Sequence, residues 1–320
     1  MKDGVLVIDK PAGITSHDVV LKARRFFRNK KVGHAGTLDP LAVGVLPLLI
    51  GEATKLSFFL MKQEKEYVAT VKFGEETDTA DSEGKVTFRG DVKNFDEKKT
   101  LEVIKAFTGK IEQIPPHFSA IKKNGVPLYK LARKGIEVEI KPREVEIKEI
   151  KVLQVSPPCL TFKVVCSSGT YIRALCRDIG RKLGYGGHLT ALNRIRSGDF
   201  SLDGSIGLKA LEEEGDKDLV WKRLIPMGAV LKDMPCLEVE KSIEDKIRCG
   251  RQPRPEDFDG IDPFLFNEGN RVRFMSKEGK LISIAEVRGS EGELNSTFSF
   301  ADKEMLGTMT LTFKLLRVFN

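Results

Sequence analysis

The run GHAGTLDPLAVGVLP, residues 33–47, places the pair Asp39-Pro40 between glycine-rich and apolar residues. Glycine and proline at this density are typical of loops, and the apolar flanks indicate an ordered loop that leads into buried structure. Asp before Pro commonly initiates a turn or caps a helix through its own side chain. The other interpretation, suggested by nearby His34 and by several basic segments, is a partly buried carboxylate that an arginine keeps ionised. The local sequence leaves both interpretations open.

The composition indicates a folded protein with a basic balance. The 320 residues are 41% hydrophobic, which is enough for a packed core in one large domain and a second, small one. Lysine and arginine number 53 against 46 acidic residues, so the formal charge is +7, and the isoelectric point is about 9.0. This balance favours a polyanionic partner, although a solvated basic surface would give the same composition.

Several classes of protein are disfavoured by the sequence. The first residues, MKDGVLVIDKPAG, contain no apolar stretch of signal-peptide length, and no apolar run approaches the roughly 18 residues of a membrane-spanning helix. We therefore expect a cytoplasmic protein without a membrane partner. The five cysteines are scattered and form no CxxC pair, which predicts reduced thiols and no metal site.

The chain before residues 33–47 is predicted to form a buried strand, a turn and a helix. The apolar run GVLVIDKPAG ends in Lys10-Pro11, and Thr15 to Asp18 resemble a capping box at the start of a helix. Apolar residues at helical spacing on this helix alternate with basic residues, which predicts one buried face and a basic ridge. The apolar set is Val19, Val20, Ala23, Phe26 and Phe27, and the basic set is Lys22, Arg24, Arg25, Arg28, Lys30 and Lys31.

A strand-rich chain with interrupting helices follows. Strands are expected at 67–74, 143–156 and 160–167. Thr100 is the expected cap of a helix that stops at Gly109. From Thr170 another helix is expected to bury one face before the glycine-rich stop GYGG, which begins at Gly184.

Two further regions stand apart from this pattern. From about Pro115 to Arg143 lysine and arginine are mixed with aromatic residues, prolines and glycines, as in an excursion from the core. Beyond about Met234 a second compact unit is expected, with strands in LEVE, VRFMS, KLISIAEVRG and TLTFKLLRVFN and a short helix in KSIEDKIRCG. The tetrapeptide KEGK predicts a hairpin between two of these strands.

Four separated segments, in order, resemble the tRNA pseudouridine-55 synthase family, TruB. They are GVLVIDKPAGITSHD, GHAGTLDPLAVGVLP, EYVATVKFGEETDTAD and CSSGTYIRALCRDIGRKLGYGGHLTALNRIRSGDF, which together span roughly residues 4–200. The C-terminal unit resembles, more loosely, the small RNA-binding PUA barrel often fused to this enzyme. The resemblance implies an α+β catalytic domain at 1–234 with a mixed, mostly antiparallel sheet, and a β-rich PUA-like domain at 235–320.

The resemblance also implies a reaction: one uridine in the T-loop of tRNA is isomerised to pseudouridine. The N-glycosidic bond breaks, the base rotates, and C5 is rejoined to the ribose. The base must first be flipped out of the folded loop, at a cost of a few kcal/mol. No cofactor, no metal and no obligatory protein partner is implied, and a monomer is expected.

The catalytic residues that the resemblance implies are Asp39, Arg173 and Tyr67. Asp39 is the essential carboxylate, acting as a nucleophile or as a base at the ribose, and it must be ionised. Arg173 is expected to pair with it, which would lower its pKa and fix its rotamer. Tyr67 is expected to stack on the target base and to help remove the C5 proton. Without the resemblance, Arg173 could equally be a solvent-facing helix residue, and Tyr67 would be taken as a strand residue packed in the core.

Further residues match substrate-binding positions of the family. Tyr171 and Leu192 are expected to line the uracil pocket, and His34 to stack in the space that the flipped base leaves. Lys10-Pro11 is expected to support the site without a catalytic step. The excursion at 115–143 resembles an inserted thumb loop that grips the T-arm through phosphate contacts. Its basic residues are Lys122, Lys123, Lys130, Arg133, Lys134, Lys141 and Arg143.

Two other functions remain open on the sequence alone. A guide-RNA-dependent relative, which modifies rRNA within a larger ribonucleoprotein, shares the catalytic motifs and the PUA unit but characteristically lacks the thumb-like insertion. A non-catalytic tRNA chaperone would use the same RNA-binding surfaces. Activity of the purified chain on tRNA, without a guide, separates these alternatives.

Overall fold

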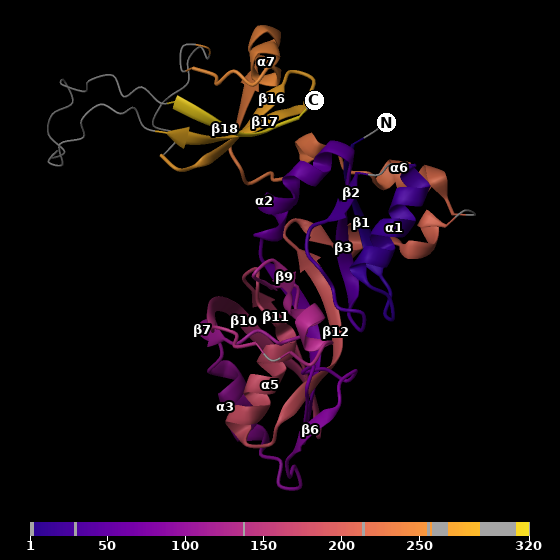
Figure 1. The fold of residues 1–320 in the computed structure, drawn as a ribbon, viewed down its shortest axis with the longest axis vertical. Helices are drawn as coiled ribbons and strands as arrows, with labels where there is room; N and C mark the ends of the chain where they lie inside the picture. Colours follow the sequence, from indigo (N-terminus) through magenta and orange to yellow (C-terminus); the bar gives the residue numbers. More distant parts are fainter. Residues whose placement is uncertain are drawn as a thin grey trace, which may run out of the picture. The chain divides into compact units, whose positions relative to one another are not determined.

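The computed structural model describes residues 3–28, 31–136, 138–212, 215–254, 257, 268–288 and 312–319. The chain divides into two compact units, drawn in Figure 1. The larger unit comprises Leu6–Leu49 and Leu56–Leu224, and the smaller comprises Met1–Val5, Ile50–Lys55 and Ile225–Asn320.

The larger unit is built on one mixed sheet. Its strands are β1 (Gly4–Lys10), β2 (Val32–His34), β3 (Val43–Ile50), β4 (Lys65–Phe73), β7 (Gly109–Gln113), β10 (Arg143–Ser156), β11 (Cys159–Cys166), β12 (Gly187–Ser197), β13 (Phe200–Ser201) and β14 (Ile206–Gly207). The order is β14-β1-β3-β12-β4-β11-β10-β7, with β13 beside β12 and β2 beside β3. The pairs β1–β14 and β3–β12 are parallel, while β4, β7, β10, β11 and β13 pair antiparallel. The predicted α+β class with a mostly antiparallel sheet is confirmed.

Helices and short hairpins complete this unit. The helices are α1 (Ser16–Phe27), α2 (Ser57–Met61), α3 (Glu97–Lys105), α4 (Leu128–Ala132), α5 (Ile172–Leu183) and α6 (Lys217–Arg223). Short 3-10 helices occur at η1 (Gly51–Leu56), η2 (Leu202–Gly204), η3 (Leu208–Leu211) and η4 (Met227–Ala229); most of η1 and all of η4 belong to the smaller unit. The hairpins are β5 (Glu75–Thr77) with β6 (Val86–Arg89), and β8 (Lys122–Lys123) with β9 (Val126–Pro127).

Strand β4 shows how the sequence pattern determines burial. Its side chains alternate strictly between buried and half-buried, so one face of the sheet is apolar. On that face Tyr67, Ala69 and Val71 lie opposite Val164, Phe162 and Leu160 of β11. The helix α5 packs on the sheet at β12 and β4, and it buries Leu175, Ile179 and Leu183. The opposite face carries charged residues of β4, which keeps it solvated.

Local signals set the helix ends. Thr15 and Asp18 form the predicted capping box of α1, and Gly184 adopts the left-handed conformation that ends α5. The prediction for α3 was wrong in detail: Asp96 caps this helix, and Thr100 lies inside it, donating to the Asp96 carbonyl. A carboxylate is the better acceptor for the free N–H groups of the first turn.

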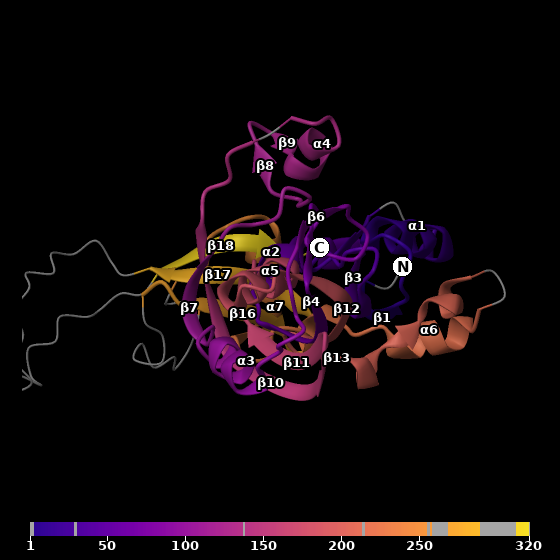
Figure 2. The same ribbon diagram turned by 90° about the horizontal axis from the view of Figure 1, so that it is seen from below.

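The basic excursion connects β7 to β10, two strands that pair directly, so both of its ends lie at one edge of the sheet. Figure 2 shows β8, β9 and α4 standing away from the sheet to which the excursion is attached. Few of its side chains are buried, Leu128 being one, and the seven basic residues named above are exposed. We call residues 115–143 the basic extension.

The smaller unit has its own sheet, in the order β15-β16-β17-β18. The strands are β15 (Cys236–Val239), β16 (Arg271–Ser276), β17 (Leu281–Arg288) and β18 (Thr312–Val318), and helix α7 (Lys241–Arg248) adds Ile243 and Ile247 to its apolar core. The predicted strands, helix and KEGK turn are thus confirmed. In the part of the chain that the structure describes, these strands form an open sheet, so the barrel remains a prediction.

Candidate active site

The carboxylate of Asp39 and the guanidinium of Arg173 face each other in the larger unit. Asp39 lies in the loop between β2 and β3, and Arg173 in the first turn of α5. Arg173 Nη2 donates to Asp39 Oδ1 at 3.2 Å, and Nε lies 2.9 Å from Oδ2. The Nε–H group is not directed at an acceptor, so the contact at Nε is an ion pair only. The expected pairing of these two residues is thus present in the structure.

A second carboxylate, which the sequence did not predict, shares the same arginine. Arg173 Nη1 donates to Asp81 Oδ2 at 3.3 Å, and the carbonyls of Thr79 and Phe118 accept from Nη1 and Nη2 at 3.1 and 2.9 Å. Asp81 is 3% exposed and also accepts from the Thr79 hydroxyl at 2.6 Å. Four acceptors therefore surround one guanidinium. The only sequence signal was that Asp81 ends the motif EYVATVKFGEETDTAD.

The backbone around Asp39 is held from two sides. The Ser16 hydroxyl accepts from the Leu38 N–H at 2.8 Å and donates to the Leu38 carbonyl at 3.0 Å. The buried Lys10 ammonium lies 3.3 Å from the Pro40 carbonyl, which also accepts from the Gly13 N–H at 2.9 Å. This geometry agrees with the supporting role expected for Lys10. Burial lowers the pKa of Lys10 to about 8, while the Asp39 charge acts against this shift.

Two opposing effects determine the ionisation of Asp39. Burial raises the pKa of this carboxyl, and the nearby Asp81 charge adds to that effect. Arg173 acts in the opposite direction, as expected, but burial has the larger effect. The expected lowering effect of Arg173 is thus present, but burial, which the sequence did not reveal, makes the net shift upward. Pairing nevertheless supplies the counter-charge that an ionised carboxylate needs in such surroundings.

Tyr67 and Leu192 lie on one face of the central sheet. Leu192 of β12 pairs with Ala69 of β4, and the next residue on that face, Arg194, pairs with Tyr67. Both Tyr67 and Leu192 are more than nine-tenths buried. Burial raises the pKa of Tyr67, and the Arg194 charge acts against this shift. These residues are suited to form an apolar wall for a planar ring.

Tyr171 and His34 occupy the surroundings of the pair. Tyr171 precedes α5, and its backbone is held by Gln113, which accepts from the Tyr171 N–H at 2.8 Å and donates to the Tyr171 carbonyl at 3.1 Å. Burial lowers the pKa of His34, and its Nδ1 has no hydrogen-bond partner among the described residues. A neutral imidazole is expected there, in keeping with stacking in preference to ion pairing.

The predicted RNA-binding residues are not part of this cluster. Lys122, Lys123, Lys130, Arg133, Lys134, Lys141 and Arg143 are exposed on the basic extension or at its end. Its base nevertheless reaches the site, because the Phe118 carbonyl accepts from Arg173. The structure thus separates a charged cluster, in which Arg173 and Asp81 are buried and Asp39 is one-third exposed, from an exposed cationic surface.

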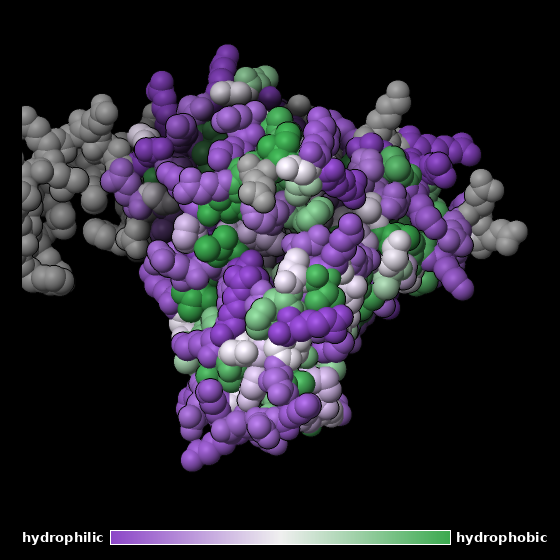
Figure 3. All heavy atoms as spheres, turned by 60° about the horizontal axis from the view of Figure 1, so that its bottom comes forward, coloured by the Kyte–Doolittle hydropathy of each residue, from purple (hydrophilic) through white to green (hydrophobic). Residues whose placement is uncertain are grey.

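Other kinds of site find little support. In the described ranges no group of three or more His, Cys, Asp or Glu side chains is placed to hold a metal ion. Nor does any described helix combine the length and apolar character needed to cross a membrane. Figure 3 shows a face on which hydrophilic side chains predominate and apolar ones occur singly or in small groups.

Comparison with known proteins places this cluster in a family. Residues 24–172 match the N-terminal domain of TruB family pseudouridylate synthases, and residues 173–232 match the tRNA pseudouridylate synthase B C-terminal domain. The tRNA pseudouridine synthase B of Syntrophotalea carbinolica is 41% identical over 318 residues, covering 99% of this chain and 98% of its own. This chain belongs to the TruB family. The enzyme of the same name from Dechloromonas aromatica is 49% identical over 248 residues, covering 78% of this chain and 82% of its own.

Solved structures give a second comparison. A chain of a Cbf5-Nop10-Gar1 complex superposes with a TM-score of 0.72 and 28% identity, covering 99% of this chain and 85% of that chain. A chain of an H/ACA ribonucleoprotein bound to a substrate RNA containing 2′-deoxyuridine gives 0.70 and 25% identity, with the same coverage. The TruB-family chain therefore has the pseudouridine synthase fold, and the two matched family segments meet between Ile172 and Arg173, inside the site.

Proposed function

We propose that this protein isomerises uridine 55 in the T-loop of tRNA to pseudouridine. The observation that carries the proposal is the Asp39–Arg173 pair beside the Tyr67–Leu192 wall. This site occurs in a chain that is 40% or more identical to several proteins named tRNA pseudouridine synthase B. Fold alone would not support the assignment, because function depends on the site residues.

The proposed chemistry balances without any added reagent. The bond between N1 of uracil and C1′ of ribose breaks, the ring turns, and C5 forms a new bond to C1′. C5 loses its proton and N1 gains one, so the product is an isomer of the substrate. We assign Asp39 as the catalytic carboxylate, ionised and oriented by Arg173. Tyr67 lies on the wall where a flipped ring would stack, and it is assigned to the removal of the C5 proton.

Substrate RNA is proposed to bind first through the basic extension. Exposed Lys and Arg side chains neutralise phosphates and release counterions without reading the sequence. The T-arm then places its loop at the site, where Tyr171 and Leu192 line the pocket and His34 fills the space of the flipped base. The Phe118–Arg173 contact joins the extension to the site.

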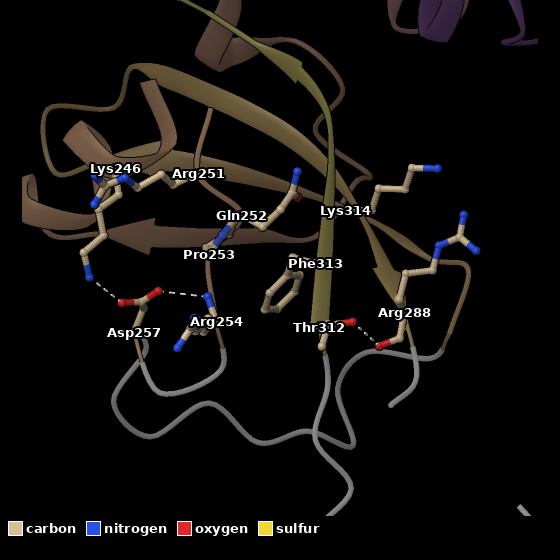
Figure 4. Close-up of a pocket in the computed structure, with 10 residues that line it drawn as sticks. All are labelled: Lys246, Arg251, Gln252, Pro253, Arg254, Asp257, Arg288, Thr312, Phe313 and Lys314. Atoms are coloured by element: carbon tan, nitrogen blue, oxygen red, sulfur yellow. Dashed lines mark hydrogen bonds and ion pairs between the residues drawn. The ribbon is translucent and has the colours of Figure 1, made fainter. Parts of the chain in front are cut away.

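Residues 235–320 are proposed to form a PUA-like RNA-binding domain, following a catalytic domain at 1–234. Support comes from a pocket of about 990 Å³ in the smaller unit, drawn in Figure 4. Cations surround this pocket: Lys246, Arg251, Arg254, Arg288 and Lys314, against one acid, Asp257. Lys246 pairs with Asp257 at 2.8 Å. The remaining positive charge suits RNA phosphates, and closure of the sheet into a barrel is part of this proposal.

One experiment tests the function directly. The purified chain is incubated with a T-arm minihelix, and pseudouridine is mapped by mass spectrometry or chemical modification. We expect stoichiometric conversion of uridine 55, and of no other uridine, with no guide RNA or other protein present. Conversion only after addition of a guide RNA and partner proteins would favour the guide-dependent alternative that the sequence left open. Tight tRNA binding with no pseudouridine under any condition would favour a chaperone.

The protein is further proposed to act alone, as a cytoplasmic monomer. The basic extension supports this, since it gives the chain an RNA-binding surface of its own. Light scattering of the protein with and without tRNA checks the oligomeric state. A stable dimer in both conditions would contradict this part of the proposal.

A further inference from the structure

Arg194 is the largest side chain that is fully buried in the described part of the chain, at 1% exposure. Its guanidinium makes backbone contacts: Nε donates to the Val45 carbonyl at 2.7 Å, Nη2 to Gly36 at 3.0 Å, and Nη1 to Thr37 at 3.4 Å. Gly36 and Thr37 precede Asp39, and Val45 follows it on β3. A single cation therefore ties together both ends of the loop that carries the catalytic carboxylate.

Arg196, on the same strand, has a different environment from Arg194. β12 contains a bulge between Arg194 and Arg196, so the two arginines project to opposite faces of the sheet. Arg196 is partly exposed and pairs with Glu64 at 2.6 Å and Glu66 at 3.0 Å. No ion pair joins Arg194 to a carboxylate of the described residues. Among the described residues its buried positive charge faces three carbonyl dipoles and interacts with the Tyr67 side chain.

The position of Arg194 links the loop to the wall of the pocket. Strand β12 lies between β3 and β4, and in this register Arg194 has Gly44 on one side and Tyr67 on the other. The approach to β3 is close, because a Cβ added to Gly44 would lie 2.3 Å from the Arg194 carbonyl. Gly44 has a φ of +101°, which also favours glycine. Arg194 is thus in contact with the loop through its side chain and paired in the sheet with the strand that carries Tyr67.

We propose that Arg194 is a positioning residue for the proposed isomerase reaction, holding the Asp39 loop and the Tyr67 wall in register from below the uracil pocket. The inference rests on the proposed function. Asp39 and Tyr67 must act on the same ring from different strands, and a small displacement of either would slow the reaction. The Arg194 charge also opposes the effect of burial on the Tyr67 pKa. If cleavage of the glycosidic bond leaves negative charge on the uracil, the buried Arg194 guanidinium behind the Tyr67–Leu192 wall would stabilise that negative charge.

The test compares Arg194→Lys and Arg194→Gln with matched changes at Arg196. Lysine keeps the charge but cannot bond to three carbonyls in the same directions, and glutamine loses the charge as well. Each variant is assayed for the single-turnover rate constant at saturating minihelix, for minihelix Kd and for Tm. We expect Arg194→Lys to lower the rate constant roughly 10- to 100-fold and Arg194→Gln further, with Kd within about twofold. Arg196→Lys and Arg196→Gln should stay within about threefold in rate.

A double-mutant cycle with Tyr67→Phe gives a readout that a merely structural role would not move. If Arg194 acts through the Tyr67 wall, Arg194→Lys costs less in the Tyr67→Phe background than alone. A rate unchanged by Arg194→Lys, a loss explained by Kd, or full additivity with Tyr67→Phe would overturn the inference. Failure of both Arg194 variants to fold would assign a structural role and overturn it as well. An inactive wild-type protein would instead refute the proposed function.

Discussion

The Asp39 cluster and the basic extension use charge in opposite ways. In the cluster the Arg173 guanidinium meets two carboxylates and two carbonyls, and it is 5% exposed. In the extension seven cations are exposed. Buried charges are costly unless each is paired, so loss of either carboxylate would leave the buried Arg173 charge less well compensated. Each exposed charge of the extension is expected to make a small and similar contribution to the free energy of RNA binding. Substitution should therefore impair chemistry in the first region and RNA affinity in the second.

Asp39→Asn should produce the largest effect. The amide has the same shape but cannot act as an anionic nucleophile or base, so we expect the single-turnover rate constant to fall at least roughly 1000-fold. The Kd for tRNA should stay within about threefold, because phosphate contacts lie elsewhere. Filter binding and quench-flow measure the two quantities. Pseudouridine formation at more than a few per cent of the wild-type rate would remove Asp39 from its assigned role.

Asp81→Asn should have the next largest effect. It keeps the size of the side chain but leaves Arg173 with a single carboxylate, so the guanidinium can tilt away from Asp39. We expect a rate constant lower by roughly 10- to 100-fold with an unchanged Kd. Asp78→Asn is the matched control, since Asp78 is exposed and bonds only locally, to the Lys85 N–H. Equal effects at the two positions would show that Asp81 has no special link to the site.

The pH dependence of the reaction sharpens the contrast further. Because burial raises the pKa of Asp39, protonation should begin at a pH above the ordinary aspartate value of 3.8. The single-turnover rate should then fall about tenfold per pH unit below that raised pKa. The Arg194→Gln variant offers a check. If Arg194 acts mainly by positioning, the rate of this variant should decrease over the same acidic pH range as the rate of the wild type. An apparent pKa at or below 3.8 in this profile would mean that Arg173 has a larger effect on the Asp39 pKa than burial has.

Neutralising part of the extension should change affinity and leave chemistry intact. Lys122, Lys123, Lys130 and Arg133, all changed to Gln, should weaken minihelix binding roughly tenfold near 0.1 M salt. The slope of log K against log salt should fall by up to about 0.7–0.9 for each phosphate that is no longer neutralised. The control changes four exposed lysines around α3, namely Lys93, Lys98, Lys99 and Lys105. A wild-type salt dependence of binding together with a lower single-turnover rate constant at saturating minihelix would contradict the assignment of RNA binding to the extension and of chemistry to the Asp39 cluster.

Local patterns in the sequence were sufficient to predict much of the fold. The capping box at Thr15 and Asp18, the alternation in β4 and the glycine end of α5 depend on near neighbours. Thr100 failed because Asp96, four residues earlier, already caps the helix by accepting from the Lys99 N–H, so the helix has begun before Thr100. Asp39 alone was undecided between a turn and a catalyst, and only the resemblance over distant segments favoured the catalyst.

The missed residues depend on distant contacts. Asp81 meets Arg173 across 92 residues and Arg194 meets Val45 across 149. Arg194 and Arg196 both lie on β12, for which the sequence predicted no strand, and the bulge between them directs one to carbonyls and the other to carboxylates. A bulge of this kind leaves no clear sequence signal. The net upward shift of the Asp39 pKa could not be predicted from the Arg173 pairing alone, because burial depends on the whole packed site.

The smallest effect is expected for the pocket of the smaller unit. In the pairing of its cations this pocket is intermediate between the Asp39 cluster and the basic extension. Some of its cations already have partners, as Lys246 has Asp257 and Arg288 has Glu286 at 2.6 Å. Arg251→Gln with Lys314→Gln should therefore weaken binding of full-length tRNA only about two- to fivefold, with a reduced salt slope. Binding of the T-arm minihelix should not change if this pocket contacts RNA beyond the T-arm. Glu238→Gln with Glu240→Gln, on the same unit, changes the charge in the opposite sense and controls for general electrostatics. If binding of full-length tRNA and of the minihelix were weakened equally, the pocket would contact the T-arm, as the basic extension is proposed to do.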